Sequence, residues 1–154
     1  MKTPLWRSYS KYLILDDVSD PGNLGTIIRS SAALGVEAII VSLDTVDEYN
    51  DKVLRATQGA IFKIPIFRMN LSDAITKLKQ DDVKIIVTSL QNSSDLKTIQ
   101  KPNKFGIILG NEAKGVHTNY LSLADEIVRI EMKNDVESLN VAMSAGIIIY
   151  YLLN

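Results

Sequence analysis

Three segments of the chain combine polar side chains with turn-forming residues in patterns that could support chemistry. The first, at residues 20–29, has the sequence DPGNLGTIIR, between an apolar run and a helical pattern. Its Pro-Gly pair predicts a turn, Asn23 can cap the following helix, and Arg29 lies under two turns further along. Ligands bind in strand-to-helix loops at the carboxyl edge of a parallel sheet, which makes Asn23 and Arg29 candidate site residues. A plain turn with a capped helix and a solvated arginine explains the same residues.

The second segment, at residues 107–115, has the sequence IILGNEAKG. A buried strand is predicted to run directly into Gly110, where the absence of a side chain lets a ligand approach the backbone. Glu112 then stands at the carboxyl end of that strand, where its carboxylate could orient an arginine or a substrate hydroxyl. The spacing does not match a phosphate-binding Walker loop. A turn with a solvated glutamate is the alternative interpretation.

The third segment, at residues 130–140, has the sequence IEMKNDVESLN and leads into an apolar helix. Ser138 and Asn140 are both good N-cap residues, and capping is the simplest explanation for either one. One helix end needs only one cap, however. The second polar residue therefore indicates a site of backbone N–H groups and side-chain donors at the start of this helix.

Alternating strand and helix patterns must position these segments. Apolar, β-branched runs predict six strands, at residues 12–15, 38–43, 64–67, 84–88, 105–109 and 126–130. Helical periodicity predicts helices at residues 23–34, 50–57, 71–80 and 139–153. Pro65 places the third strand at an edge or makes it a strand start. This order predicts an α/β fold with a mostly parallel six-stranded sheet flanked by helices.

The final predicted helix, at residues 139–153, is apolar on all sides. Such a helix is normally buried. At the end of a small domain this indicates a second partner surface, most simply an interface with another subunit.

Composition excludes several classes of protein. The chain has 154 residues, 46% of them hydrophobic and 23% charged, which fits one folded domain and excludes a wholly disordered protein. There is no cysteine and only one histidine, His117, so neither a disulfide framework nor a convincing metal site can be built, and we expect no metal. The formal net charge is −1, so any binding to nucleic acid must depend on a local basic patch.

No targeting or membrane segment is evident. The longest apolar run, at residues 145–153, is far shorter than the roughly 20 residues of a membrane span. The N-terminus lacks the apolar core of a signal peptide. We therefore expect a cytoplasmic protein that does not associate with membranes.

Taken together and in this order, the three segments resemble the SpoU (TrmH-type) branch of the SPOUT methyltransferases. The resemblance extends from about residue 12 to residue 152, with motifs DPGNLGTIIRSSAALG, IILGNEAKGV and IEMKNDVESLNVAMSAGIIIYY. It implies an enzyme that uses S-adenosyl-L-methionine to methylate a ribose 2′-hydroxyl of transfer or ribosomal RNA. It also implies a deep C-terminal trefoil knot and a homodimer whose interface contains the last helix and the helix of the first motif.

The resemblance assigns roles by matching positions. The catalytic set that it implies is Asn23, Arg29, Glu112, Ser138 and Asn140. The usual cofactor-contact positions are Gly110, Ile130 and Leu139, with Ser89, Leu90 and Met132 as their expected neighbours.

The implied reaction is a displacement at a sulfonium, so the protein must align the ribose oxygen with the methyl group and assist loss of its proton. Arg29, donated across the dimer, is expected to contact the hydroxyl or the adjacent phosphate. Because arginine stays protonated, electrostatic stabilisation of a developing alkoxide suits it better than base chemistry.

The chain departs from the family pattern in two respects. Only about eleven residues precede the first strand, so residues 1–154 are expected to form a single catalytic domain without the N-terminal RNA-binding domain of many members. A minimal enzyme and an excised catalytic domain both remain open. The third motif has IEMKND in place of the more usual version with proline and glycine, which predicts a less rigid loop.

Two other functions compete with methyl transfer. One is a non-catalytic RNA- or cofactor-binding domain of the same fold, which loss of Asn23, Arg29 or Glu112 would favour. The other is a flavodoxin-like nucleotide-binding module, for which the chain lacks a phosphate-cradling loop.

Overall fold

The structure is a computed structural model that describes residues 9–154, and its centre is a fully parallel sheet of seven strands in the order β3-β2-β1-β6-β4-β7-β5. The strands are β1 (Lys11–Leu15), β2 (Ala38–Val41), β3 (Ile66–Arg68), β4 (Lys84–Thr88), β5 (Ser94–Asp95), β6 (Phe105–Leu109) and β7 (Glu126–Arg129). The predicted α/β class and parallel sheet are confirmed. Because every strand runs the same way, their carboxyl ends share one edge of the sheet.

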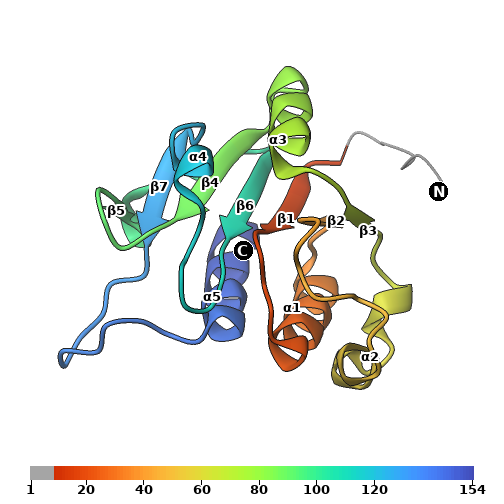
Figure 1. Ribbon diagram of the computed structural model, residues 1–154. Coiled ribbons are helices and arrows are strands. Elements are labelled where there is room, and N and C mark those ends of the chain that lie inside the picture. Colours follow the sequence, from red (N-terminus) through yellow and green to blue (C-terminus); the bar gives the residue numbers. More distant parts are fainter. Residues whose placement is uncertain (1–8) are drawn as a thin grey trace.

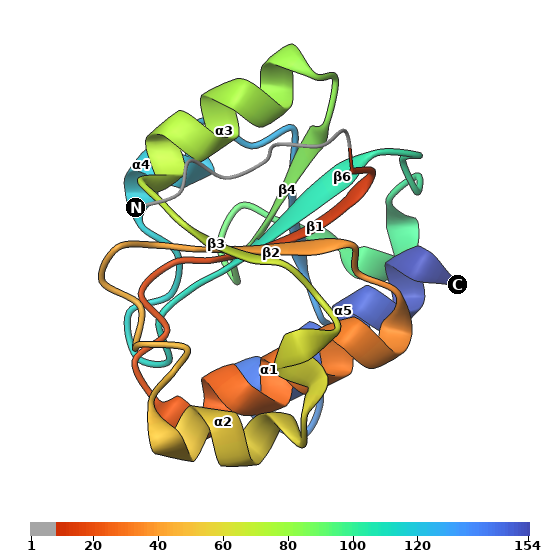
Figure 2. The same ribbon diagram turned by 90° about the vertical axis from the view of Figure 1, so that its right-hand side faces the viewer.

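Helices cover both faces of this sheet. Three lie on one face, namely α1 (Pro21–Leu34), α2 (Asp51–Thr57) and α5 (Val141–Leu153), and two on the other, α3 (Leu71–Gln80) and α4 (Thr118–Leu121) (Figure 2). Short 3-10 turns follow α2 and β5, at η1 (Ala60–Phe62) and η2 (Leu96–Thr98). Along the α1 face, Figure 1 shows α5, α1 and α2 side by side, with α1 in the middle.

The strand sequences explain this layering. In β1, Leu13 and Leu15 face the core on the α1 side, whereas Tyr12 and Ile14 face the core under α3. Alternate residues of a strand point to opposite faces, so a strand covered on both sides must be apolar throughout. The buried runs of the sequence are therefore the central strands of the sheet.

The predicted count of six strands is wrong by one, because β5 adds a seventh at the edge. It has only two residues, Ser94 and Asp95, which pair with Val128 and Arg129 of β7. A polar pair carries no apolar periodicity, so backbone pairing alone makes it a strand. The other predicted strands are present with shifts of a few residues at their ends, and β3 lies at the opposite edge, as Pro65 indicates.

Helix starts depend on side-chain caps, and one predicted cap is wrong. The helix α1 begins at Pro21, two residues earlier than predicted, and Asp20 caps it by accepting a hydrogen bond from the Asn23 backbone N–H. Proline fits the first helical position because a backbone N–H there would have no partner within the helix, and proline has no N–H. The side chain of Asn23 is thereby left free for other contacts.

The helix α5 begins at Val141 rather than at residue 139 and is only half buried within the chain. Ala145 and Ile149 are fully buried against the sheet and α1, whereas Met143 and Tyr150 are 58% and 61% exposed. This exposed face is the side of the helix for which the sequence predicts a second partner surface, and that partner stays a prediction. Within residues 9–154, no helix is long and apolar enough to cross a membrane.

Candidate active site

The candidate site lies at the carboxyl edge of the sheet, where four loops meet. They are the β1–α1 loop, the turn after β4, the β6–α4 loop and the long segment between β7 and α5, which swings away from the body in Figure 1. Three of these loops hold the three polar segments of the sequence. The parallel topology therefore brings together residues that are about 90 to 120 positions apart, as in the Asn23–Glu112 and Asn23–Asn140 pairs.

Glu112 forms the centre of a hydrogen-bonded cluster. Its carboxylate accepts from the Ser19 N–H at 3.0 Å, the Ser19 hydroxyl at 3.1 Å and the Asp20 N–H at 2.8 Å. The Asn23 side-chain amide donates to the same carboxylate at 3.2 Å. Asn140 then donates from its amide to the Asn23 carbonyl oxygen at 3.0 Å. Asn23, Glu112 and Asn140 thus form one connected unit.

This cluster keeps Glu112 ionised. Partial burial by itself raises the pKa of Glu112, but the N–H groups of Ser19 and Asp20 and the amide of Asn23 stabilise the charged form. The net result lowers the pKa of Glu112 from its ordinary 4.5 to about 2. A carboxylate that is charged at any physiological pH accepts hydrogen bonds and orients its partners rather than donating a proton.

Asn140 and Ser138 have different positions, although both are cap residues by type. Asn140 caps α5, where its side-chain oxygen accepts from the N–H groups of Ala142 and Met143. Its amide remains free to donate to Asn23. Ser138 makes no such cap and instead lines a neighbouring cavity. The expectation that one helix end needs only one of the two is confirmed.

The cavity beside the cluster has a volume of about 510 Å³, in the range of small-molecule sites. The three positions matched to cofactor contacts, Gly110, Ile130 and Leu139, all line it. So do their expected neighbours, Ser89, Leu90 and Met132. Glu112 and Ser138 are among its polar lining residues. The structure therefore gathers around one cavity eight of the eleven site residues that the sequence indicates.

Gly110 is required by the loop that follows it. A Cβ atom on Gly110 would lie 2.1 Å from the Gly115 carbonyl carbon and 2.2 Å from the Val116 nitrogen. The β6–α4 loop therefore folds back onto the end of β6 at a distance that only glycine allows. Asn111 holds this fold, since its backbone exchanges hydrogen bonds with Gly115 and its side-chain amide donates to the Asp17 carbonyl. Gly110 is therefore needed for the close approach of the Gly115 and Val116 backbone, independently of any ligand.

Sequence reasoning missed the residues that hold the loops in place. Asp16 is only 7% exposed, and its carboxylate accepts from the His117 N–H at 2.7 Å. Burial raises the pKa of Asp16, and the His117 N–H partly offsets that effect. Ser19 and Asp20 supply the N–H groups for Glu112. The signal available was the polar run directly after the buried strand at residues 12–15, where parallel strands present their loops.

Arg29 does not join the cluster within one chain. It is exposed on α1 and lines neither the 510 Å³ cavity nor the groove between α1 and α5. That groove encloses about 1130 Å³ and is lined by Asn23 and Asn140 together with the exposed apolar side chains of α5, among them Met143 and Tyr150. The Asn23–Asn140 hydrogen bond therefore lies where the groove approaches the cavity.

Comparison with known proteins shows what this architecture resembles. The model of the SpoU rRNA Methylase family matches residues 10–150. The 23S rRNA (guanosine(2553)-2′-O)-methyltransferase RlmP of Bacillus subtilis is 41% identical over 142 residues, which are 92% of this chain and 57% of that protein. A 23S rRNA (guanosine-2′-O-)-methyltransferase RlmB of Xylella fastidiosa is 34% identical over 90% of this chain and 56% of its own length. The chain therefore spans little more than half of these relatives.

Solved structures agree with the sequence comparison. An AdoMet-bound rRNA methyltransferase from Sinorhizobium meliloti superposes with a TM-score of 0.90 at 35% identity, over 95% of this chain and 56% of that one. The SpoU methyltransferase AviRb from Streptomyces viridochromogenes, in complex with AdoMet, gives 0.86 at 27% identity over 97% of this chain and 58% of its own. In sequence and in fold, the chain belongs to the SpoU rRNA methylase family.

Proposed function

We propose that this chain is the catalytic domain of an S-adenosylmethionine-dependent RNA methyltransferase that acts on a ribose 2′-hydroxyl. One observation carries the proposal: Asn23, Glu112 and Asn140 are joined by hydrogen bonds beside a cavity lined by every expected cofactor position. The RlmP and RlmB relatives are named as 2′-O-methyltransferases of 23S rRNA. That likeness makes ribosomal RNA the first substrate to test and transfer RNA the second.

The cavity suits S-adenosylmethionine in size and lining. Its apolar side chains, such as Ile130, Leu139 and Ile148, can pack against an adenine ring. Backbone groups around Leu90 and Gly110 and the hydroxyl of Ser89 are available as hydrogen-bond partners. When bound, the cofactor supplies an electrophilic methyl group on a sulfonium, so the chain need not create an electrophile.

The residues of the chain would then align and stabilise the incoming ribose. Glu112, held ionised, fixes the orientation of Asn23, which in turn accepts from Asn140. The resulting rigid edge can position a sugar oxygen. Alignment of this kind lowers the activation barrier by several kcal/mol. Ser138 offers a hydroxyl on the wall of the cavity. A positive charge near the hydroxyl is still needed to stabilise the developing alkoxide.

We propose that a second copy of the chain supplies that charge through Arg29. The groove between α1 and α5 exposes Met143, Ile147 and Tyr150, an apolar surface that a C2 dimer would bury. Because the groove approaches the Asn23–Asn140 pair, a partner seated there can bring its own α1 toward the site. The dimer and the contribution of Arg29 in trans are thus one proposal.

We also propose that the C-terminal segment forms the expected trefoil knot. The strand β7 pairs with β4 and β5, after which residues 130–140 return past the β6–α4 loop so that α5 packs on α1. The cavity is lined by both that returning segment and the loop. A threaded path would hold these two walls together.

Calorimetry and methyl transfer test the proposed function directly. We expect the chain to bind S-adenosylmethionine but not flavin mononucleotide or NAD. It should also transfer a tritiated methyl group to deproteinised bacterial ribosomal or transfer RNA, with nuclease digestion yielding 2′-O-methyl nucleosides. Failure to bind the methyl donor, or transfer only to a base, would overturn the proposal.

Complementation tests the role of Arg29. Arg29→Ala should lower kcat at least about 100-fold and leave cofactor affinity within about twofold, because the side chain does not line the cavity. In the proposed C2 dimer each site combines Asn140 of one protomer with Arg29 of the other. A heterodimer of an Arg29→Ala protomer and an Asn140→Ala protomer therefore has one intact site and one site that lacks both residues. Random exchange should then restore about a quarter of the normal activity. No recovery on mixing would mean that Arg29 does not act across the dimer.

A further inference from the structure

We propose that α2 and the turn after it form an RNA-binding face that holds the strand next to the reacting ribose. This α2 face consists of Lys52, Arg55, Phe62 and Lys63. The inference rests on the proposed function and deepens it, because it assigns the RNA contacts to a particular surface. A chain of net charge −1 needs its phosphate-binding cations gathered in one place.

Charge is sharply divided in this part of the sequence. Residues 52–63 (KVLRATQGAIFK) contain three cations and no acid, whereas residues 44–51 (DTVDEYND) contain four acids and no cation. Lys52, Arg55 and Lys63 are all exposed, and none is in a salt bridge within residues 9–154. Among the acids, Glu48 is neutralised by Arg68 at 2.7 Å. Lys52 and Arg55 on α2 and Lys63 just after η1 are thus three cations without a salt-bridge partner, which match a phosphate backbone.

The packing of α2 on α1 places this face beside the candidate site. Lys52 lies next to Gly22 at the start of α1, and a Cβ on Gly25 would meet the Ala56 Cβ at 2.3 Å. The contact moves from Gly22 to Gly25 in α1 as it moves from Lys52 to Ala56 in α2, so the two helices run in the same direction. The α2 face therefore begins near the Asn23 cluster and extends along α1 in the direction of Arg29. The close approach at Gly25 also fixes α2 rigidly to the helix that carries Asn23.

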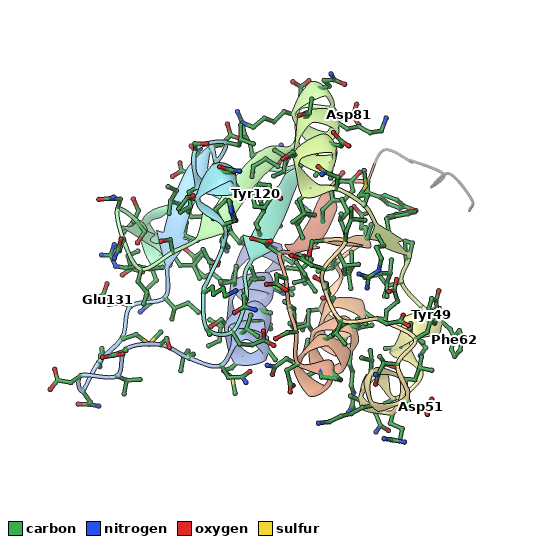
Figure 3. All side chains as sticks on the ribbon, viewed as in Figure 1. Tyr49, Asp51, Phe62, Asp81, Tyr120 and Glu131 are labelled. Atoms are coloured by element: carbon green, nitrogen blue, oxygen red, sulfur yellow. The ribbon has the colours of Figure 1, made fainter. Side chains whose placement is uncertain are left out.

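Phe62 gives the face an aromatic platform. It is 88% exposed, the most exposed of the large hydrophobic side chains that the structure describes. Gln58 and Gly59 both have positive φ and reverse the chain after α2, and the 3-10 turn that follows ends at Phe62. Figure 3 shows Phe62 at the outer edge of the molecule, directed away from the sheet. Unstacked RNA bases are commonly held on such aromatic rings between phosphate-binding cations.

The face stays open in the proposed dimer. The helix α1 lies between α5 and α2 (Figure 1), and the apolar groove is formed by α1 and α5. A second copy seated on that groove therefore leaves α2 uncovered. A strand of RNA could thus cross from the Asn23 cluster onto α2 without displacing the partner.

Two double variants with the same change in net charge test the face. Lys52→Ala with Lys63→Ala removes cations from it, and Lys84→Ala with Lys97→Ala removes two exposed cations elsewhere, at the start of β4 and in η2. Binding of a fluorescein-labelled, mixed-sequence single-stranded RNA is measured by anisotropy at several salt concentrations. We expect the first pair to lower the slope of log affinity against log salt by about 1.4, and the second pair to leave it unchanged.

Phe62→Ala tests stacking independently of charge. We expect it to weaken RNA binding about tenfold, with Phe62→Trp restoring affinity. Affinity for S-adenosylmethionine should stay unchanged in all of these variants. In transfer assays the face variants should raise KM for RNA while kcat is retained, because no member of the face belongs to the catalytic cluster.

The outcomes separate this inference from the proposed function. If the unaltered chain methylates RNA but the two double variants show equal salt slopes and equal KM, the α2 face is wrong and the function stands. Loss of tight RNA binding in the Lys84 and Lys97 control alone would also overturn the face. If the unaltered chain binds the cofactor but transfers no methyl group to RNA, the proposed function fails first.

Discussion

Replacing Glu112 by glutamine tests the hydrogen-bonded cluster most directly. The carboxylate accepts from two backbone N–H groups, one hydroxyl and the Asn23 amide. Glutamine keeps the size of the side chain but turns one acceptor oxygen into a donor that faces other donors. The substitution removes the charge and leaves at least one N–H of the β1–α1 loop without a partner.

The pKa of Glu112 sets the magnitude. A carboxylate with a pKa of about 2 in the folded chain and 4.5 ordinarily contributes at most ~3 kcal/mol above pH 5. Glu112 is on the exposed side of the cluster, so solvent screening reduces this to about 1–2 kcal/mol. Because the folded pKa is lowered, the contribution is present above the ordinary pKa and is lost as pH falls from about 4.5 toward 2.

Denaturant unfolding at two pH values measures this effect. We expect Glu112→Gln to lower the free energy of unfolding by about 1–2 kcal/mol near pH 7, and by less than half as much near pH 3. Glu126→Gln, which removes an exposed carboxylate at the start of β7, should have little effect at either pH. An equal loss of stability at both pH values would refute the conclusion that the loop N–H groups hold an ionised carboxylate.

Two further substitutions test the positioning of the loops. Gly110→Ala should cost about 3 kcal/mol or more and weaken S-adenosylmethionine binding, because its Cβ would overlap the Gly115 backbone. Gly146→Ala serves as its control in thermal unfolding of the monomer at high dilution, because outside its own turn of helix its Cβ meets no atom of the chain within 4 Å; equal behaviour of the two would contradict the close approach. Asp16→Asn keeps an acceptor for the His117 N–H but removes a carboxyl whose pKa is raised by burial. The unfolded chain loses that proton first as pH rises, so the variant should gain stability relative to the parent as pH rises from 3.8, the ordinary pKa of this carboxyl, toward neutrality. A relative loss of stability over that range would show that the buried charge is favourable.

The sequence determines the elements of the fold wherever one residue pattern has one stable outcome. Continuous apolar runs identified the buried strands, and Pro65 correctly assigned β3 to an edge. Asn140 is one of the predicted caps, and it caps α5. The apolar pattern does not predict β5, which is a strand only through backbone pairing. It also misses the first residues of α1, because Asp20 caps the helix and Pro21 begins it before the first apolar residue.

The candidate site was only partly determined by the sequence. Residue types and order indicated Asn23, Glu112 and Asn140, but their mutual hydrogen bonds span about 90 to 120 residues and exist only because the parallel strands end at one edge. The exposure of Arg29 and the close backbone contact at Gly110 depend on how helices and loops pack. Local sequence fixes which atoms are available for chemistry. Long-range packing fixes their distances, since burial, strand order and loop closure are properties of the whole chain rather than of any segment.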